Sequence, residues 1–248
     1  MDDILVSIIT VCYNSESTIS RTIESVMHQT YRNIQYIIID GKSTDHTMDI
    51  VNSYKDEFGD RIKIVSEKDD GIYYAMNKGI CLSDGTLVGL INSDDYYEND
   101  AVEKVVNKYK ENHSNPLSVY YGADRAWRDG KIYAISFHSA EFLQNSMISH
   151  PATFITKEAY KIFGMYDTKY KCVADYDLLL KYKESGKIDF VPIYEILANF
   201  TCGGACSSES AQLELLDLQV GHGIRTKRSV LLEKFFIKKA MCMKKRRN

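Results

Sequence analysis

Apolar runs alternate with amphipathic stretches along the first half of the chain. The runs lack polar alternation, which is typical of strands buried on both faces of a sheet. They cover residues 4–11, 34–39, 62–65 and 86–91. The stretches between them have helical spacing and cover residues 17–28, 44–58 and 72–82. This order predicts an α/β fold in which a mostly parallel sheet carries helices on both faces.

The pattern is looser after residue 117. Two apolar runs, 119–122 and 131–136, flank a turn at 128–130 and predict a hairpin. Helices are expected at 140–146, 157–163 and 174–185, and short strands at 188–191 and 195–200. Neither an internal repeat nor a low-complexity linker interrupts the chain, so we expect one principal domain.

Composition narrows the class of protein. The 248 residues, 44% of them apolar, can bury one large core. No apolar run approaches the roughly 18 residues that a membrane-spanning helix needs. Six cysteines without a CxxC pair favour reduced thiols over a zinc site. Residues 1–3 lead directly into the first apolar run, without the basic and apolar parts of an export signal, so we expect a cytoplasmic protein.

Charge is distributed unevenly. Residues 225–248 hold ten Lys or Arg and one Glu, about +9, whereas residues 1–224 hold 21 basic and 33 acidic groups, about −12. The basic segment also has the spacing of a helix with an apolar stripe formed by Leu232, Phe235, Phe236, Ala240 and Met243. This combination fits a segment that lies on the inner face of an anionic membrane. A solvated tail or a helix docked on the body fits it equally well. Nucleic acid is a poorer partner because the acidic body would repel phosphates.

Carboxylates follow several of the predicted strands. The motif Asn92-Ser93-Asp94-Asp95 comes directly after the apolar run 86–91, Asp40 follows the run 34–39, and Asp175 opens a predicted helix. Open α/β sheets bind ligands at the carboxyl ends of their strands. Adjacent carboxylates repel each other unless they are solvated or bridged, and Mg²⁺ or Mn²⁺ is held by one or two carboxylates plus phosphate oxygens. The alternative is that Asp94 and Asp95 are solvated residues capping a helix that starts near residue 99.

Asp40 has a ligand role in this interpretation. It could cap the turn that follows it, but Ser43 or Asp45 can perform that cap. This leaves Asp40 without an obvious structural task, so we favour a ligand contact for Asp40 and a capping role for Asp45.

Four segments in this order resemble the family 2 glycosyltransferases, which have the GT-A fold. They are residues 6–14, 31–47, 66–79 and 92–95, and the resemblance spans most of residues 4–205. It implies a Rossmann-like, mostly parallel central sheet with helices on both faces, a smaller acceptor-side extension and C-terminal helices. It also implies a GT-A domain over residues 1–224, with a nucleotide-sugar-binding part to about residue 115, and a separate basic tail over 225–248.

The resemblance assigns roles to single residues. It implies a catalytic base at Asp175, a divalent metal (Mn²⁺ or Mg²⁺) at Asp95, and nucleotide contacts at Thr10, Tyr13, Asn14, Asp40, Asn77 and Asp94. Three weaker candidates for acceptor or diphosphate contacts are His150, Trp127 and His222. Each of these three could instead be structural.

The chain also departs from the family pattern. Ala174 stands where many members have a glutamate before the catalytic aspartate, Gly41-Lys42 stands at a second acidic position, and Tyr74 stands at a common aspartate. These differences affect the expected identity of the sugar donor more than the expected class of reaction.

The function implied is an inverting, metal-dependent transfer of a sugar from a nucleotide donor, UDP-linked by expectation, to a glycan or lipid-linked acceptor. The enzyme would be a hexosyl- or N-acetylhexosaminyltransferase of bacterial polysaccharide biosynthesis. Such a displacement needs a metal at the leaving diphosphate and a carboxylate base, but no protein nucleophile. A non-catalytic nucleotide-sugar-binding subunit is the alternative. A sugar-phosphate nucleotidyltransferase fits less well, because residues 12–17 lack a glycine-rich, basic phosphate loop.

Overall fold

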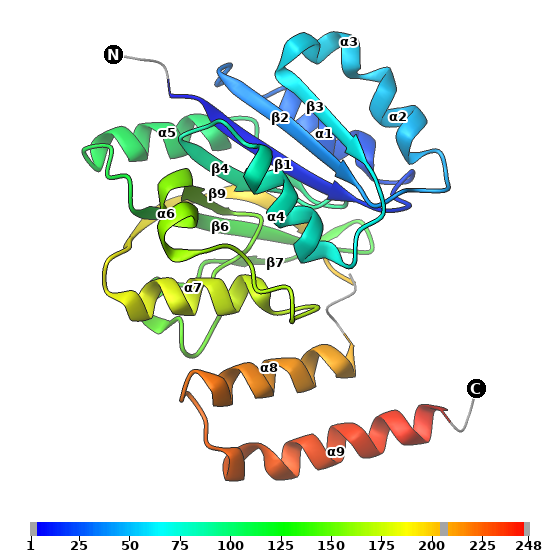
Figure 1. Ribbon diagram of the computed structural model, residues 1–248, viewed down its shortest axis with the longest axis vertical. Helices are drawn as coiled ribbons and strands as arrows, with labels where there is room; N and C mark the ends of the chain where they lie inside the picture. Colours follow the sequence, from blue (N-terminus) through cyan, green and yellow to red (C-terminus); the bar gives the residue numbers. More distant parts are fainter. Residues whose placement is uncertain (1–3, 204–207, 246–248) are drawn as a thin grey trace.

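The computed structural model describes residues 4–203 and 208–245, and within them one sheet of nine strands forms the centre of the fold (Figure 1). Eight strands follow one another in the order β3-β2-β1-β4-β8-β6-β9-β5, and β7 pairs with β6. Their bounds are β1 Val6–Cys12, β2 Ile34–Asp40, β3 Ile62–Ser66, β4 Leu87–Leu90, β5 Tyr96–Tyr97, β6 Ser118–Arg128, β7 Lys131–Ser136, β8 Thr153–Thr156 and β9 Asp189–Thr201.

The strand directions bring most carboxyl ends to one edge of the sheet. β1 lies between β2 and β4 and is parallel to both, and the register places Cys12 opposite Asp40. β8 is antiparallel to both β4 and β6, so β6 regains the direction of β4, and β9 is parallel to β6. The loops after β1, β2, β3 and β4 therefore meet the end of β9 at a single edge.

Alternate residues of the central strands point to opposite faces. Ile9 and Ile37 pack with one helical layer, whereas Ile8 and Ile38 pack with the other. The first layer contains α4 (Ile72–Leu82), α6 (Lys157–Phe163) and α7 (Ala174–Ser185), and the second contains α1 (Ile19–Met27), α2 (Thr47–Ser53), α3 (Lys55–Phe58) and α5 (Ala101–Glu111). This arrangement confirms the predicted α/β architecture with helices on both faces.

Helix α4 packs closely on the sheet because of a glycine. A Cβ atom added at Gly79 would lie 2.5 Å from Cγ2 of Ile9 on β1. A side chain there would push α4 away from the strand ends. The glycine thus allows α4 to pack close to the sheet. The first turn of this helix borders the carboxyl edge of the sheet.

The observed elements differ from the predicted ones mainly in the second half. The helix expected at 140–146 is only a short 3₁₀ turn, η2 (Ala140–Phe142), and the strands expected at 188–191 and 195–200 form one strand, β9. The helix expected at 44–58 is divided into α2 and α3, and the 3₁₀ turn η1 (Gly59–Arg61) follows it. β5 and β8 were not predicted, because two to four residues carry too little periodicity to identify a strand.

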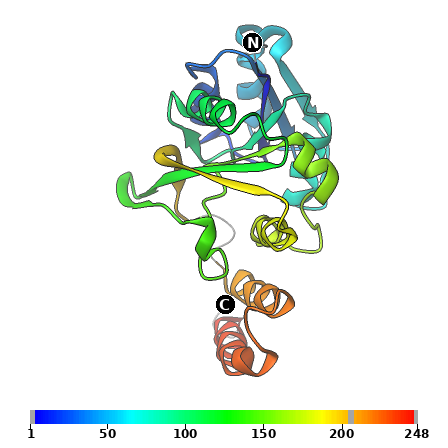
Figure 2. The same cartoon turned by 90° about the vertical axis from the view of Figure 1, so that its left-hand side faces the viewer.

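Two helices stand apart from the sheet. α8 (Glu209–Gly221) and α9 (Lys227–Lys245) run antiparallel to each other and form a hairpin below the body in Figures 1 and 2. Leu218 of α8 contributes to the core on the α7 side of the sheet. Among the described residues, none of the helices combines the length and the hydrophobicity needed to cross a bilayer.

Candidate active site

A cleft of about 950 Å³ opens at the carboxyl edge of the sheet. Its walls come from the segments that follow β1, β2, β3 and β4, together with the first turn of α4 and the end of β9. The residues that line it include Tyr13, Asn14, Gly41, Lys68, Gly71, Ile72, Asn92, Asp94 and Thr201. The topology therefore gathers distant segments of the chain around one space, as expected for an open α/β sheet.

The loop after β1 contributes Tyr13 and Asn14. The Tyr13 side chain is 61% exposed and lies beside Gly41. Asn14 has a positive φ of 49°, which its own loop contacts support. Its backbone N–H donates to Ser43 Oγ at 2.9 Å, and its Oδ1 accepts the backbone N–H of Thr44 at 2.8 Å. Both residues line the cleft, where the sequence interpretation expected them.

Thr10 and Asn77 have structural positions instead of the predicted nucleotide contacts. Thr10 is fully buried within β1, where its Oγ1 accepts a hydrogen bond from the Tyr36 hydroxyl at 3.0 Å. Asn77 bonds the backbone of Tyr166 through both of its amide atoms, at 2.8 and 3.0 Å. Neither side chain lines the cleft. Their segments reach the cleft through other residues, because only some side chains of a strand or helix point toward the edge.

Asp40 also differs from the prediction, because it has a full structural task. It is completely buried, and its carboxylate accepts the backbone N–H of Ser43 and the hydroxyls of Ser43 and Ser66. Asp40 thus ties the loop after β2 to the end of β3, beneath the cleft wall rather than on it. Asp45, as expected, caps a turn by accepting the Thr47 backbone N–H at 3.0 Å.

The two neighbouring aspartates occupy different depths. Asp94 lines the cleft, whereas Asp95 lies behind it and is only 1% exposed. Burial raises the pKa of the Asp94 carboxyl, and the nearby Arg21 partly opposes this rise. Burial, followed by repulsion from Asp94, raises the pKa of Asp95 to about 8. The pair therefore resists carrying two negative charges unless a cation is present.

The donor atoms at this position suit a hard divalent cation. Oδ1 of Asp95 accepts the backbone N–H of Thr201 at 2.9 Å, but Oδ2 is buried without a hydrogen bond, and so is Oδ1 of Asn92. Unpaired buried oxygens are costly and are usually explained by a ligand or a proton. The described residues contain no group of three or more His, Cys, Asp or Glu side chains that could hold a metal alone. A Mn²⁺ or Mg²⁺ ion here would share its coordination with substrate oxygens.

Two residues that the sequence did not reveal hold this acidic loop. The Arg21 guanidinium donates to the Asp94 carbonyl at 2.8 Å, and the Thr201 hydroxyl donates to the same carbonyl at 2.6 Å. Arg21 comes from α1 and Thr201 from the end of β9. No sequence motif marks Arg21 or Thr201, because each contacts a residue that lies more than 70 positions away along the chain.

Asp175 lies at the start of α7, beside the cleft. Its Oδ1 accepts the Tyr73 hydroxyl at 3.1 Å and the backbone N–H of Tyr176 at 3.0 Å. Tyr73 belongs to the first turn of α4, where the adjacent Gly71 and Ile72 line the cleft. The resemblance placed the base at Asp175, but it gave Tyr73 no contact with that residue. The first turn of α4 therefore connects the cleft to the carboxylate.

A small cavity of about 10 Å³ is lined by both Asp175 and His150. Burial raises the pKa of Asp175, and the neighbouring His150 partly opposes this rise. Burial also lowers the pKa of His150, so the imidazole favours its neutral form. The His150 ring lies near Tyr166, with 3.4 Å between Nε2 and the hydroxyl. His150 is thus close to the predicted base, and its contact with the acceptor stays a prediction.

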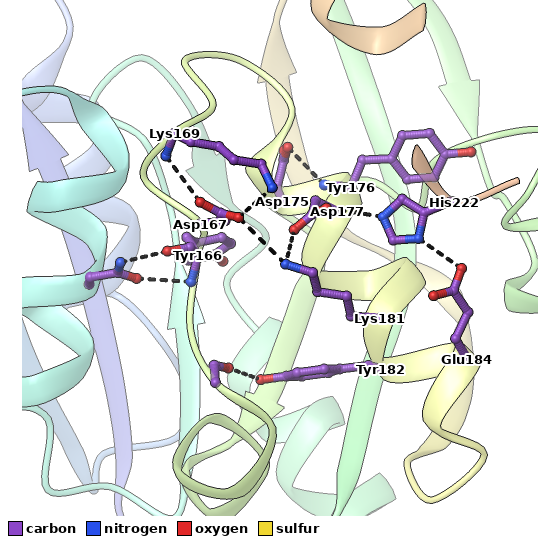
Figure 3. A network of polar contacts seen from close by, with 12 residues as sticks. Tyr166, Asp167, Lys169, Asp175, Tyr176, Asp177, Lys181, Tyr182, Glu184 and His222 are labelled. Carbon is purple, nitrogen blue, oxygen red and sulfur yellow. Dashed lines mark hydrogen bonds and ion pairs between the residues drawn. The ribbon is translucent and has the colours of Figure 1, made fainter. Parts of the chain in front are cut away.

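The other two weak candidates lie elsewhere. Trp127 donates from Nε1 to Oδ1 of Asn199 at 2.8 Å and does not line the cleft. His222 ends α8, and its two ring nitrogens lie 3.0 Å from Asp177 and 2.8 Å from Glu184 (Figure 3). It neither reaches the cleft nor forms an exposed turn, because its side chain is only 9% exposed. Its contacts are with the part of α7 that follows Asp175.

The sequence profile of the family described as "Glycosyl transferase family 2" matches residues 7–162, more than half of the chain. The chain belongs to the family 2 glycosyltransferases.

Curated relatives are similar over most of this chain. Chondroitin synthase of Escherichia coli is 31% identical over 220 residues, 87% of this chain and 31% of that protein. Hyaluronan synthase of Pasteurella multocida is 31% identical over 190 residues, 74% of this chain and 19% of that protein. The chain thus spans less than a third of the length of these two synthases. A PGL/p-HBAD biosynthesis glycosyltransferase of Mycobacterium bovis (strain BCG / Pasteur 1173P2) is 27% identical over 85% of this chain and 82% of that protein.

Solved structures share the fold at low identity. TarS 1–349 of S. aureus in complex with UDP-GlcNAc superposes with a TM-score of 0.71 and 16% identity, over 88% of this chain and 66% of that one. The mannosyltransferase PcManGT of Pyrobaculum calidifontis, in complex with GDP-Man and Mn²⁺, gives 0.65 and 16%, over 90% and 64% of the two chains. These likenesses support the GT-A architecture.

Proposed function

We propose that the protein is an inverting, metal-dependent glycosyltransferase. It would move a sugar from a nucleotide-sugar donor, UDP-linked in our proposal, to a hydroxyl of a glycan or lipid-linked acceptor in polysaccharide biosynthesis. The observation that carries this proposal is the pairing of the cleft with Asp175. The Asp175 carboxyl has a raised pKa and accepts a hydrogen bond from Tyr73, whose neighbours Gly71 and Ile72 line the cleft. Asp94 lines the same cleft, and behind it Asp95 has a buried oxygen without a hydrogen bond.

Asp175 would act as the general base. The acceptor oxygen attacks the anomeric carbon as the bond to the donor diphosphate breaks, and the acceptor proton passes to Asp175. A raised pKa makes the carboxylate a better proton acceptor near neutral pH. The Tyr73 hydroxyl, 3.1 Å from Oδ1, would orient this carboxylate toward the cleft. Inversion follows from a single displacement, which needs no covalent intermediate with the protein.

The leaving group would be bound at the acidic pair. Asp94, Asp95 and the Asn92 amide oxygen would hold a Mn²⁺ or Mg²⁺ ion. When bound, this ion would neutralise negative charge on the diphosphate. Because Asp94 faces the cleft and Asp95 lies behind it, we extend the predicted metal role of Asp95 to Asp94. Lys68, also on the cleft wall, adds a positive charge near the donor.

The donor class is proposed from the neighbouring structures and tested directly. TarS is described in complex with UDP and with UDP-GlcNAc, and PcManGT with GDP-Man. We propose UDP-hexose or UDP-N-acetylhexosamine for this chain, because TarS, which shares the fold, is described in complex with UDP-GlcNAc.

The test is a thermal-shift and calorimetric screen of UDP, GDP and TDP with and without Mn²⁺, followed by transfer assays with the matching sugars. A ligand that binds the folded state raises the melting temperature by mass action. We expect UDP to stabilise the protein in a Mn²⁺-dependent manner, with slow donor hydrolysis in the absence of acceptor. Preference for another nucleotide would overturn the donor assignment, and the absence of any nucleotide effect would overturn the reaction class.

A non-catalytic binding subunit is a second candidate, favoured by one residue. Ala174 is fully buried in the apolar core where the family commonly has a glutamate. Tight binding of UDP and Mn²⁺ with neither hydrolysis nor transfer to any acceptor would support this alternative.

A further inference from the structure

Helix α9 presents four large apolar side chains to solvent. Leu231, Leu232, Phe235 and Phe236 are 67%, 71%, 59% and 63% exposed, and we call them the α9 patch. Residues with this spacing lie on one face of a helix. Val230, which lies on the other side, is 2% exposed. Because α9 packs against α8 while these four side chains stay exposed, the patch faces away from α8 and the hairpin leaves it uncovered.

The same face is positively charged. Arg228 lies one turn before Leu232 and Lys239 one turn after Phe235, and both are exposed. Lys227 and Lys238 flank the stripe and are exposed as well. Glu233 is the acidic residue of α9, but it points to another side of the helix and pairs with Arg225 at 2.9 Å. The α9 patch thus combines apolar bulk with cationic edges, which is the pattern of helices that lie in a membrane interface.

The α8–α9 hairpin is held in place on the body. The Glu214 carboxylate of α8 accepts the backbone N–H groups of Lys171 and Cys172, at 2.8 and 2.7 Å. At the other end of α8, His222 lies between Asp177 and Glu184 of α7 (Figure 3). These contacts lie on both sides of Asp175 along the chain. A surface that bound the α9 patch would therefore hold α7 and its carboxylate in a fixed orientation.

We propose that the α9 patch docks on the surface of a bilayer that contains anionic lipids. The apolar side chains would enter the interface while the four basic groups contact headgroup phosphates. Charge complementarity favours this partner over a second copy of the chain: in a symmetric pair, Arg228 and Lys239 of each copy would face the same basic groups of the other. The structure differs from the predicted stripe by adding Leu231. The side chains of Ala240 and Met243, which the prediction included, lie outside the described residues.

The experiment is sedimentation of the full chain with vesicles of phosphatidylcholine, alone or mixed with phosphatidylglycerol. One variant carries Phe235→Ser with Phe236→Ser, and another carries Arg228→Glu with Lys239→Glu. The matched controls are Ile162→Ser on α6, where the side chain is 56% exposed, and Lys110→Glu on α5. Melting curves are recorded for every variant, so that loss of binding is separated from loss of folding.

We expect the wild-type chain to bind the anionic vesicles and to leave them as salt is raised. Each basic group near an anionic surface contributes on the order of fivefold in partition. Reversing the charge at Arg228 and Lys239 should therefore lower partition about tenfold or more. Replacing the two phenylalanines removes apolar area from the interface and should lower it about tenfold or more as well, while the controls leave it unchanged. Failure of the wild-type chain to bind anionic vesicles overturns the proposal, as does equal binding by the variants.

A different outcome would assign the patch to self-association. In that case the wild-type chain would not bind vesicles, and sedimentation velocity would show a dimer that dissociates in the Phe235→Ser with Phe236→Ser variant. Because binding is measured without any sugar donor, these outcomes are independent of the proposed transferase activity.

Discussion

Asp95 and Asp175, to which we assign the donor and acceptor sides of the proposed site, both have a raised pKa, but the causes differ. At the end of β4, Asp95 is affected by burial and by the charge of its neighbour Asp94. At the start of α7, burial raises the pKa of Asp175, and the neighbouring His150 and the hydrogen bonds from Tyr176 and Tyr73 oppose this rise. A pair of like charges with an unpaired oxygen is suited to a cation, whereas a single shielded carboxylate is suited to a proton. The environment, and not the residue type, separates the two roles.

Two buried aspartates near the cleft, Asp40 and Asp95, also differ in their hydrogen bonding. Asp40 and Asp95 end or follow strands on either side of β1, and both are buried. Asp40 receives donors on both oxygens, whereas Asp95 has a donor on one oxygen only. Asp40 therefore has both oxygens occupied by hydrogen bonds within the protein, whereas Asp95 keeps one oxygen available for a ligand.

The largest expected effect is on the acceptor side. Asp175→Asn removes the proposed base while keeping its shape, so transfer should fall by about 10²- to 10⁴-fold. Initial-rate assays with the donor found in the nucleotide screen check this. The matched control is Asp60→Asn, an exposed position of η1. Transfer by Asp175→Asn at the wild-type rate would remove this residue from the mechanism.

The second effect is on the donor side. Asp94→Asn and Asp95→Asn each remove one charge from the proposed cation site, and we expect a loss of about 10²- to 10³-fold in turnover, similar to the loss of one preorganised electrostatic contact. Titration of Mn²⁺ during the assay should show that more metal is needed by both variants. An unchanged requirement for Mn²⁺ would place the ion elsewhere.

The third effect is a pH dependence of stability to which Asp95 contributes. Because the pKa of Asp95 is raised to about 8, the metal-free folded chain keeps a proton that the unfolded chain loses near pH 4. This contribution to the free energy of unfolding is complete below about pH 4 and is lost as pH rises toward 8. Denaturation between these values should show a decline with pH that Asp95→Asn flattens. The same slope in wild type and variant would contradict the raised pKa.

The smallest expected effect concerns Tyr73, which connects the cleft-lining turn of α4 to Asp175. Tyr73→Phe removes the hydroxyl that donates to Asp175 but keeps the ring in the core, so we expect a loss of about tenfold, consistent with one hydrogen bond to a charged group. The loss should appear in kcat with little change in the KM for the donor. A change confined to KM would mean that Tyr73 acts on donor binding and does not orient the base.

The hydrophobic pattern predicted the first half of the fold well, because its strands are long, apolar and parallel. Helix α4 was predicted at its observed bounds, and so was α7. The predictions failed at β5 and β8, which are short, and at η2, where three residues form a single turn. Such segments are held by the sheet around them, and their own periodicity is too weak to reveal them.

The site was predicted in its segments more than in its side chains. Tyr13, Asn14 and Asp94 line the cleft, but Thr10 and Asn77 face the interior. Family motifs identify a loop or strand end, whereas the direction of each side chain depends on register. Arg21, Tyr73 and Thr201 could not be found from the sequence, because their roles arise from contacts between distant segments.

The most direct test measures the affinity of UDP, with Mn²⁺ present and absent, for Asp95→Asn and Asp175→Asn side by side by calorimetry. We predict that Asp175→Asn binds UDP with the full Mn²⁺-dependent gain of the wild-type chain, while Asp95→Asn loses that gain. A loss in Asp175→Asn, or a full gain in Asp95→Asn, would contradict the division of roles between the two sides.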